Sequence, residues 1–172
     1  MKSSEQHEMV KSIIARLETA DPAEKEKAEL ELRELCLHTA KPGAGDQRKE
    51  LSRELAQHLG EKTGKATKTC ILENLERIGG KEAVPPVAAV LADPAPRLRE
   101  EARRALQANP DPSAGEALRA ALENSDSAPW TIALLNALGY RKNEKNVPLF
   151  SSYLTNTSDD IVSAAAAALG RT

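Results

Sequence analysis

The sequence predicts an all-α fold, a right-handed α-solenoid of about five antiparallel helix pairs. Aromatic residues make up only 2% of the 172 residues, so the core must consist of alanine, leucine, valine and isoleucine. Such a composition favours closely packed helices, because the side chains that favour strands are scarce. Apolar residues also recur with a period of about 32 residues, and each period contains two helical patterns.

Three sets of apolar positions define the repeat. Leu98, Trp130 and Val162 are evenly spaced, and each begins a second helix. The leucines that close the first and second helices recur at nearly the same spacing. Those leucines are Leu91, Leu122 and Leu154 for the first helices and Leu106, Leu138 and Leu169 for the second. Three markers with one period indicate a tandem repeat.

We expect one domain over residues 1–172, built from helix pairs joined by turns. In the third unit, Val84, Val87 and Leu91 share one face of the first helix. The first two units are longer, and the loop KPGAGDQ at 41–47 between them is the expected mobile connector. The expected unit boundaries are 4–38, 46–79, 82–108, 112–139 and 144–170.

Turn and capping residues separate the expected helices. Asn-Pro-Asp-Pro at 109–112 and the polar segment at 155–160 are typical of turns followed by N-caps. Asp159 and Asp160 look like paired catalytic carboxylates, but acidic residues at a helix start complement the helix dipole, which is the better explanation. Three glycines are expected to end second helices in the left-handed conformation: Gly79, Gly139 and Gly170.

Two segments of the third unit resemble a HEAT repeat. DPAPRLREEARRAL, residues 93–106, is similar to the second helix of that repeat, and AVPPVAAVLAD, residues 83–93, is similar to its first helix. ADPAEKEKAELELREL, from Ala20, is the same second helix in the first unit. The resemblance extends from Lys65 to the C-terminus and fits the short bacterial and HEAT-like lyase-type repeats.

The resemblance implies a non-catalytic protein–protein interaction or scaffolding module with an unknown protein partner. It also implies a ladder between units that Asp93 and Arg99 would join, although Thr131 and Ser163 replace the arginine in the next two units. Two alternatives stay open. One is a HEAT-like enzyme of the chromophore lyase or DNA glycosylase type, and the other is an interaction segment of a larger enzyme.

The motifs in the sequence argue against catalysis and metal binding. GEKTGKA, residues 60–66, is one residue too short for a phosphate-binding loop and lacks the hydroxyl residue that holds magnesium. Cys36 and His38 point in different directions on one helix, and His7 and His58 have no neighbour at ligand spacing. No Gly-x-Ser-x-Gly nucleophile motif occurs. We therefore expect no catalytic, cofactor-binding or metal-binding residues.

The charge balance argues against nucleic acid as a partner. The chain has 24 Lys and Arg against 26 Asp and Glu, whereas nucleic-acid binders gather a basic excess on one face. No apolar run is long enough for a membrane span, and the N-terminal segment lacks the apolar region of a signal peptide. As written, the sequence predicts a cytoplasmic protein with reduced, buried Cys36 and Cys70, with a removed signal peptide as the alternative.

The densest basic cluster is expected to be a solvated helix face. Its arginines are interleaved with Glu100 and Glu101, which favours ion pairs within the helix, with an acidic protein partner as the alternative. The cluster comprises Arg97, Arg99, Arg103 and Arg104.

A partner-binding surface is expected on the concave face formed by the second helices. Trp130 begins the apolar stripe of its helix and is expected to pack in the core, whereas Tyr140 and Tyr153 are expected to be exposed. The expected concave-face residues are Thr69, Glu73, Arg97, Glu101, Arg104, Ile132 and Asn136.

The C-terminal end of the array is expected to be apolar. The last unit ends in AAAAALGRT rather than in a polar capping helix, and uncapped solenoid ends associate readily. We therefore expect the natural chain to continue beyond Thr172, with self-association through this end as the alternative.

Overall fold

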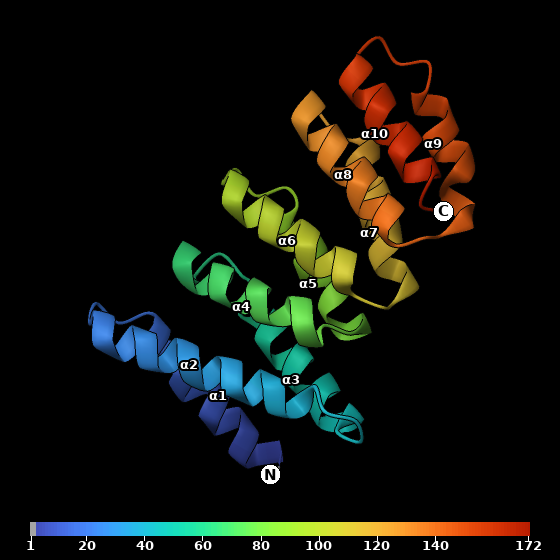
Figure 1. The fold of residues 1–172 in the computed structure, drawn as a ribbon. Coiled ribbons are helices and arrows are strands. Elements are labelled where there is room, and N and C mark those ends of the chain that lie inside the picture. The colour runs from blue at the N-terminus through green and yellow to red at the C-terminus, as the bar shows by residue number, and fades with distance from the viewer. Residues whose placement is uncertain (1–2) are drawn as a thin grey trace.

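The computed structural model describes residues 3–172, and within that range every regular element is helical. Along residues 3–172 there are ten α-helices and two short 3-10 helices. The α-helices follow one another as helix pairs (Figure 1). The first helices of the pairs are α1 (Ser3–Leu17), α3 (Gly45–Gln57), α5 (Val84–Val90), α7 (Pro112–Glu123) and α9 (Val147–Tyr153). The second helices are α2 (Pro22–Thr39), α4 (Lys65–Ile78), α6 (Pro96–Ala108), α8 (Ala128–Tyr140) and α10 (Asp159–Leu169). The 3-10 helices η1 (Lys81–Ala83) and η2 (Glu144–Asn146) precede α5 and α9.

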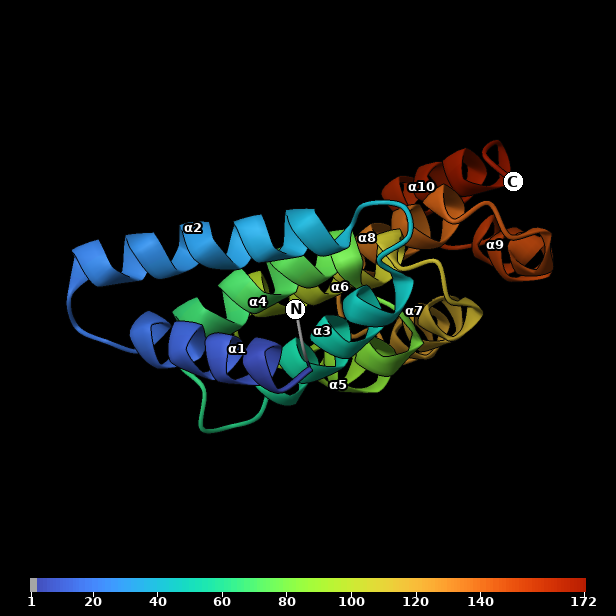
Figure 2. The ribbon, with the colours of Figure 1, turned by 90° about the horizontal axis from the view of Figure 1, so that it is seen from below.

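The helix pairs form a right-handed α-solenoid, which confirms the predicted fold class. The second helices lie side by side in one layer, and the first helices form the other layer (Figures 1 and 2). The two termini lie at opposite ends of the stack, so the array does not close on itself. Both layers are one helix thick, and each pair packs on the pair before it and the pair after it.

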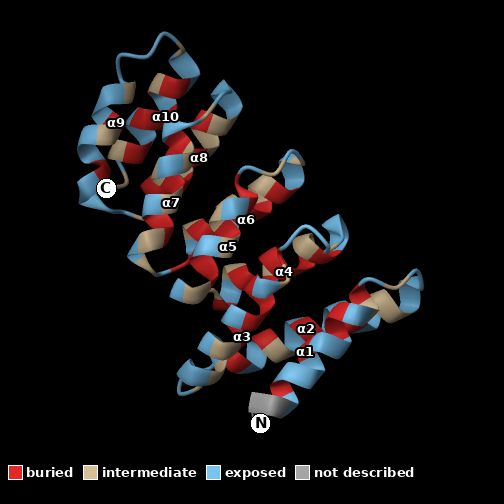
Figure 3. Cartoon of the chain, turned by 180° about the vertical axis from the view of Figure 1, so that it is seen from behind, coloured by how far each residue is buried: buried red, intermediate tan, exposed pale blue. Residues whose placement is uncertain are grey.

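The core is a continuous strip between the layers. Buried residues lie where the helices face one another, and exposed residues lie on the outer sides (Figure 3). Leu32 in α2, Ile71 in α4 and Leu106 in α6 are fully buried, as is Phe150 in α9. A single helix pair would leave part of its apolar surface exposed to water. Stacking the pairs buries that surface between neighbouring units.

Asp-Pro sequences begin two helices, at 111–112 as the sequence predicts and also at 21–22. Asp21 is the N-cap of α2 and accepts a hydrogen bond from Ala23 N at 2.9 Å. Asp111 caps α7 in the same way, accepting from Ser113 N at 3.0 Å. Asp93 accepts from the N–H of Ala95 at 2.8 Å, but α6 begins only at Pro96. The second proline of the Asp-Pro-Ala-Pro sequence therefore moves the helix start beyond the Asp-Pro step.

Gly79 and Gly170 end α4 and α10 as C-cap residues, as predicted, but none of the three glycines is left-handed. Gly79 and Gly170 have φ of −54° and −66°, and Gly139 lies inside α8. The left-handed glycine is instead Gly43, with φ of 90°, in the turn between α2 and α3. At Gly139 the reason for glycine is packing, because a Cβ there would lie 2.8 Å from the Cα of Ala168 on α10.

Arg141 ties the third pair to the fourth. Its guanidinium donates hydrogen bonds to the carbonyl oxygens of Leu106 at 2.7 Å and Asp111 at 2.8 Å, and also to that of Asn109. Burial lowers the pKa of the guanidinium. The carbonyls at the C-terminus of α6, which have no partner inside the helix, are thereby satisfied by a residue from the next pair.

None of the helices between residues 3 and 172 is long and apolar enough to cross a membrane.

Candidate functional site

The seven expected concave-face residues all lie on the second helices α4, α6 and α8. Arg97 and Arg104 on α6 are exposed, with 74% and 48% of their side chains accessible. The flanking residues are half-buried: Thr69 and Glu73 on α4, and Ile132 and Asn136 on α8. We call the surface that these residues share the second-helix face.

Ion pairs cross the second-helix face from α4 to α6. Glu73 lies 3.8 Å from Arg97, and Glu76 lies 3.2 Å from Arg104, measured between oxygen and nitrogen atoms. Within α6, Arg103 pairs with Glu100 at 2.6 Å, as the interleaved charges predict. Exposed pairs of this kind add little stability, on the order of 0.2–1 kcal/mol each. Their side chains therefore remain available to re-pair with a partner.

Glu101 differs from the other expected face residues because it is buried. Only 9% of the residue is accessible, and its nearest cation, the Nη1 of Arg104, lies 3.8 Å away. Burial raises the pKa of the carboxyl group. Glu101 lies three residues after Leu98 on α6, a spacing that brings it next to the core stripe. It belongs to the contact between α4 and α6 rather than to an open surface.

The α8 part of the second-helix face is joined to the C-terminus. Arg171 donates from Nη1 to Oδ1 of Asn136 at 3.2 Å, and its guanidinium lies 4.7 Å from the ring centre of Tyr140. Tyr140 is 58% accessible, as expected, whereas Tyr153 is half-buried. The exposed ring of Tyr140 and the guanidinium of Arg171 thus lie side by side at this end of the face.

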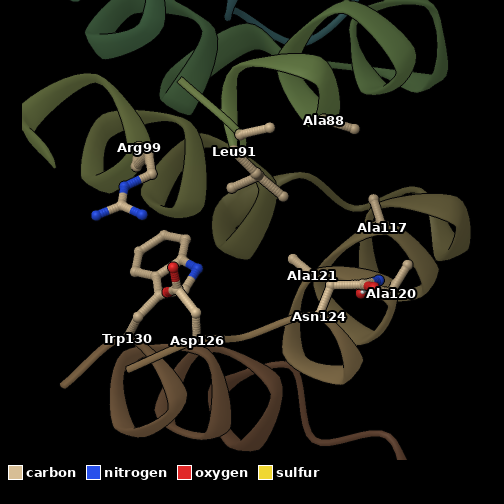
Figure 4. Close-up of a pocket in the computed structure, with 10 residues that line it drawn as sticks. Ala88, Leu91, Arg99, Ala117, Ala120, Ala121, Asn124, Asp126 and Trp130 are labelled. Atoms are coloured by element: carbon tan, nitrogen blue, oxygen red, sulfur yellow. Dashed lines mark hydrogen bonds between the residues drawn. The ribbon is translucent and has the colours of Figure 1, made fainter. Parts of the chain in front are cut away.

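A cavity of about 520 Å³ opens between the third and fourth helix pairs. We call it the wedge. One side is formed by α5, α6 and the turn between them, and the other by α7, α8 and the turn between those two (Figure 4). Alanines and Leu91 form its apolar lining, and four larger polar or aromatic residues complete it. The lining residues are Ala88, Leu91, Ala92, Arg99, Ala117, Ala120, Ala121, Asn124, Asp126 and Trp130.

Arg99 and Trp130 form the most distinctive pair in the wedge. The guanidinium carbon of Arg99 lies 5.2 Å from the centre of the indole ring, a cation–π distance (Figure 4). Within residues 3–172, Arg99 makes no ion pair, and its buried Nε has no hydrogen-bond acceptor. Asp126, on the turn before α8, is exposed. The wedge therefore holds one incompletely satisfied cation and one solvated acid.

Sequence reasoning missed this pair. The resemblance placed Arg99 in a ladder with Asp93, but Asp93 caps its own turn and Arg99 lies against the next unit. Trp130 packs against the core, as expected, but it is only half-buried and also lines the wedge. The repeat itself contains the signal, because Leu98 and Trp130 are equivalent positions in neighbouring units. The residue after Leu98 therefore lies close to the start of the next second helix.

The two cysteine thiols lie in the core. Cys36 and Cys70 are free and buried, and burial raises the pKa of both thiols to about 12, so both are protonated at neutral pH. Among the described residues, no three His, Cys, Asp or Glu side chains are placed to hold a metal ion. Residues 60–64 form the turn between α3 and α4 rather than a phosphate-binding loop after a strand.

Comparison with solved structures supports the repeat fold. The complex of CpcE and CpcF of phycocyanin lyase from Nostoc sp. PCC7120 matches at 23% identity and a TM-score of 0.58, covering 92% of this chain and 63% of that chain. A designed armadillo repeat protein in complex with the peptide (KR)4 matches at 14% identity and a TM-score of 0.52, covering 92% and 80%. An engineered protein matches at 18% identity and a TM-score of 0.50, covering 94% and 78%.

These similarities show a HEAT- or armadillo-like repeat fold and nothing finer, because the identities of 23%, 18% and 14% are too low to carry a function across. The chain spans 63% of the length of the lyase chain. No family model matches the sequence, and no match was found among curated proteins.

Proposed function

We propose that this chain is a protein–protein interaction module whose second-helix face is the concave, partner-binding side of the solenoid. The supporting observation is that α4, α6 and α8 present exposed Arg97 and Arg104 beside half-buried polar and apolar side chains in one layer. Arginine is one of the residue types that dominate binding energy at protein interfaces. The structures it resembles include a complex of two lyase chains and a designed repeat protein with a bound peptide.

Selection from a random peptide library tests this function even while the partner is unidentified. We expect the immobilised chain to enrich peptides with a shared sequence pattern and measurable affinity. The double variant Arg97→Glu/Arg104→Glu should lower the affinity for the selected peptides at least about tenfold. Each charge reversal removes a favourable contact and adds a repulsive one.

The matched control reverses two charges in the other layer. Lys11 on α1 and Arg53 on α3 are both exposed, and Lys11→Glu/Arg53→Glu should leave the affinity unchanged. Circular dichroism would verify that both double variants fold. A library that yields no enriched peptide, or peptides sensitive only to the control reversal, would contradict the proposal.

The competing hypothesis is catalysis of the chromophore lyase type, suggested by the likeness to the lyase complex. A bilin that forms a coloured covalent adduct with this chain would favour the enzyme. Salt-dependent binding of duplex DNA would in turn favour the glycosylase type.

A further inference from the structure

Two cavities have residues of both α6 and α8 in their lining. Besides the wedge, a second cavity of about 480 Å³ lies farther along the same helices. Arg99 faces the first cavity and Arg103, one turn later on α6, faces the second. We call the two cavities together the α6–α8 groove. The second cavity is lined by Arg103, Gln107, Ala133, Asn136, Tyr140 and Arg171.

The wedge suits an apolar side chain. Half of its lining residues are alanines, and Leu91 and the half-buried indole of Trp130 are the larger apolar surfaces. A leucine-sized side chain would bury apolar area there and fill space between two repeat units that small side chains leave open. Burying such a side chain fully contributes about 1.5–3 kcal/mol in transfer free energy.

The charges of the groove favour a partner with carboxylates. Three guanidinium groups line it, and only that of Arg103 has an ion-pair partner, Glu100, among the described residues. Arg171 donates to a neutral amide, and the buried Nε of Arg99 has no acceptor. The second cavity has no acidic residue in its lining.

Asp126 at the wedge does not reverse this preference. Its side chain is exposed and already hydrated, so a cationic ligand would replace water contacts that are equally good. The guanidinium of Arg99 is half-buried and makes no ion pair among the described residues, so a charge-assisted hydrogen bond to a carboxylate would add a partner that it lacks in the free protein. The asymmetry between Arg99 and Asp126 therefore selects acidic rather than basic ligands.

We propose that the α6–α8 groove binds an extended acidic segment of a partner protein, with a leucine-sized side chain in the wedge and flanking carboxylates on Arg99 and Arg171. This inference rests on the proposed interaction function and specifies the chemistry of the partner. Hydrogen bonds between guanidinium and carboxylate groups would orient the bound segment, and the apolar side chain in the wedge would fix its position along the groove.

The fluorescence of Trp130 provides a direct test, since it is the only tryptophan in the sequence. The probe is a short acetylated peptide with a central leucine and glutamates on both sides. We expect it to change the emission of Trp130 saturably, because the leucine side chain would lie against the indole. Two comparison peptides, one with lysines in place of the glutamates and one with serine in place of the leucine, should each bind at least about tenfold more weakly.

Two variants separate the charge from the apolar contact. Arg99→Gln should lower the affinity for the acidic peptide about tenfold, as expected for the loss of one charge-assisted contact. Ala121→Leu fills the wedge beside Trp130 and should abolish the preference for leucine over serine, while the protein stays folded. Arg53→Gln on α3 is the matched control and should bind like the unmodified chain.

Three results would overturn the inference: equal binding of the lysine peptide, equal binding of the serine peptide, or an Arg99→Gln variant with unchanged affinity. These results differ from failure of the proposed function. If the peptide library enriches ligands that depend on Arg97 and Arg104 but the acidic peptide does not affect Trp130, the chain is an interaction module with a different partner chemistry. If the library also yields nothing, both proposals fail.

Discussion

The carboxylate of Glu101 is the clearest local conflict on the second-helix face. It is buried, one of its oxygens accepts no hydrogen bond, and Arg104 is too far away to form a close pair. Burial raises its pKa, so the folded state holds the proton more tightly than the unfolded chain does. Stability therefore falls as the pH rises above the ordinary glutamate pKa of 4.5.

Glu101→Gln should consequently stabilise the protein at neutral pH, by up to about 1 kcal/mol, because it removes a buried charge. Well below pH 4.5 the carboxyl is protonated in both states, so the gain should vanish there. Urea unfolding at neutral and at acidic pH measures both effects, with exposed Glu116→Gln on α7 as the control. A variant that is less stable than this control at neutral pH would show that the distant pair with Arg104 outweighs the burial cost.

Single-residue environments are the least predictable from sequence. The repeat pattern identifies which face of α6 is apolar, but it does not say how closely α4 approaches, and that approach buries Glu101. It also does not say that the seam beyond α6 is open, which leaves Trp130 half-buried. The burial of Glu101 and the partial exposure of Trp130 both depend on the sizes of side chains in neighbouring units. The pattern of a single repeat carries no information about those side chains.

The contact between α8 and α10 depends on a glycine in the last turn of α8, Gly139. A Cβ at Gly139 would lie 2.8 Å and 2.9 Å from the Cα and Cβ of Ala168, so the two helices would have to separate. Gly139→Ala should destabilise the protein by about 1–3 kcal/mol through this overpacking, although alanine favours helices. Gly45→Ala is the matched control because a Cβ there meets nothing within 4 Å, and it should be neutral or slightly stabilising.

Thermal or urea unfolding measures the stability of Gly139→Ala relative to that of Gly45→Ala. Equal stabilities would show that α10 can shift without loss and that the close approach is not needed. The sequence pattern singles out Gly139 but predicts the wrong role for it, since both a helix end and a close helix contact select glycine. By contrast, the Asp-Pro starts of α2 and α7 are predictable, because capping depends only on local residues.

The stack of helix pairs makes stability a sum of local terms. Each pair packs only on its neighbours, and the two ends of the chain lie far apart (Figure 1). The period of about 32 residues predicts this order, because it shows which units are adjacent without any knowledge of side-chain contacts. In such an array the terminal pairs have one neighbour instead of two, and they should open more readily than the middle.

Amide hydrogen exchange on the Gly139→Ala variant tests that organisation. Weakening the interface of α8 with α10 should accelerate exchange in α9 and α10, whereas α1 to α6 should keep the protection of the unmodified chain. The reason is that the fifth pair rests on the fourth alone, so opening the fifth pair exposes one interface and leaves the first four pairs stacked. A uniform acceleration along the chain would mean that the protein unfolds as one cooperative body despite its linear arrangement. Gly45→Ala, measured in parallel, controls for the effect of adding a methyl group to any helix.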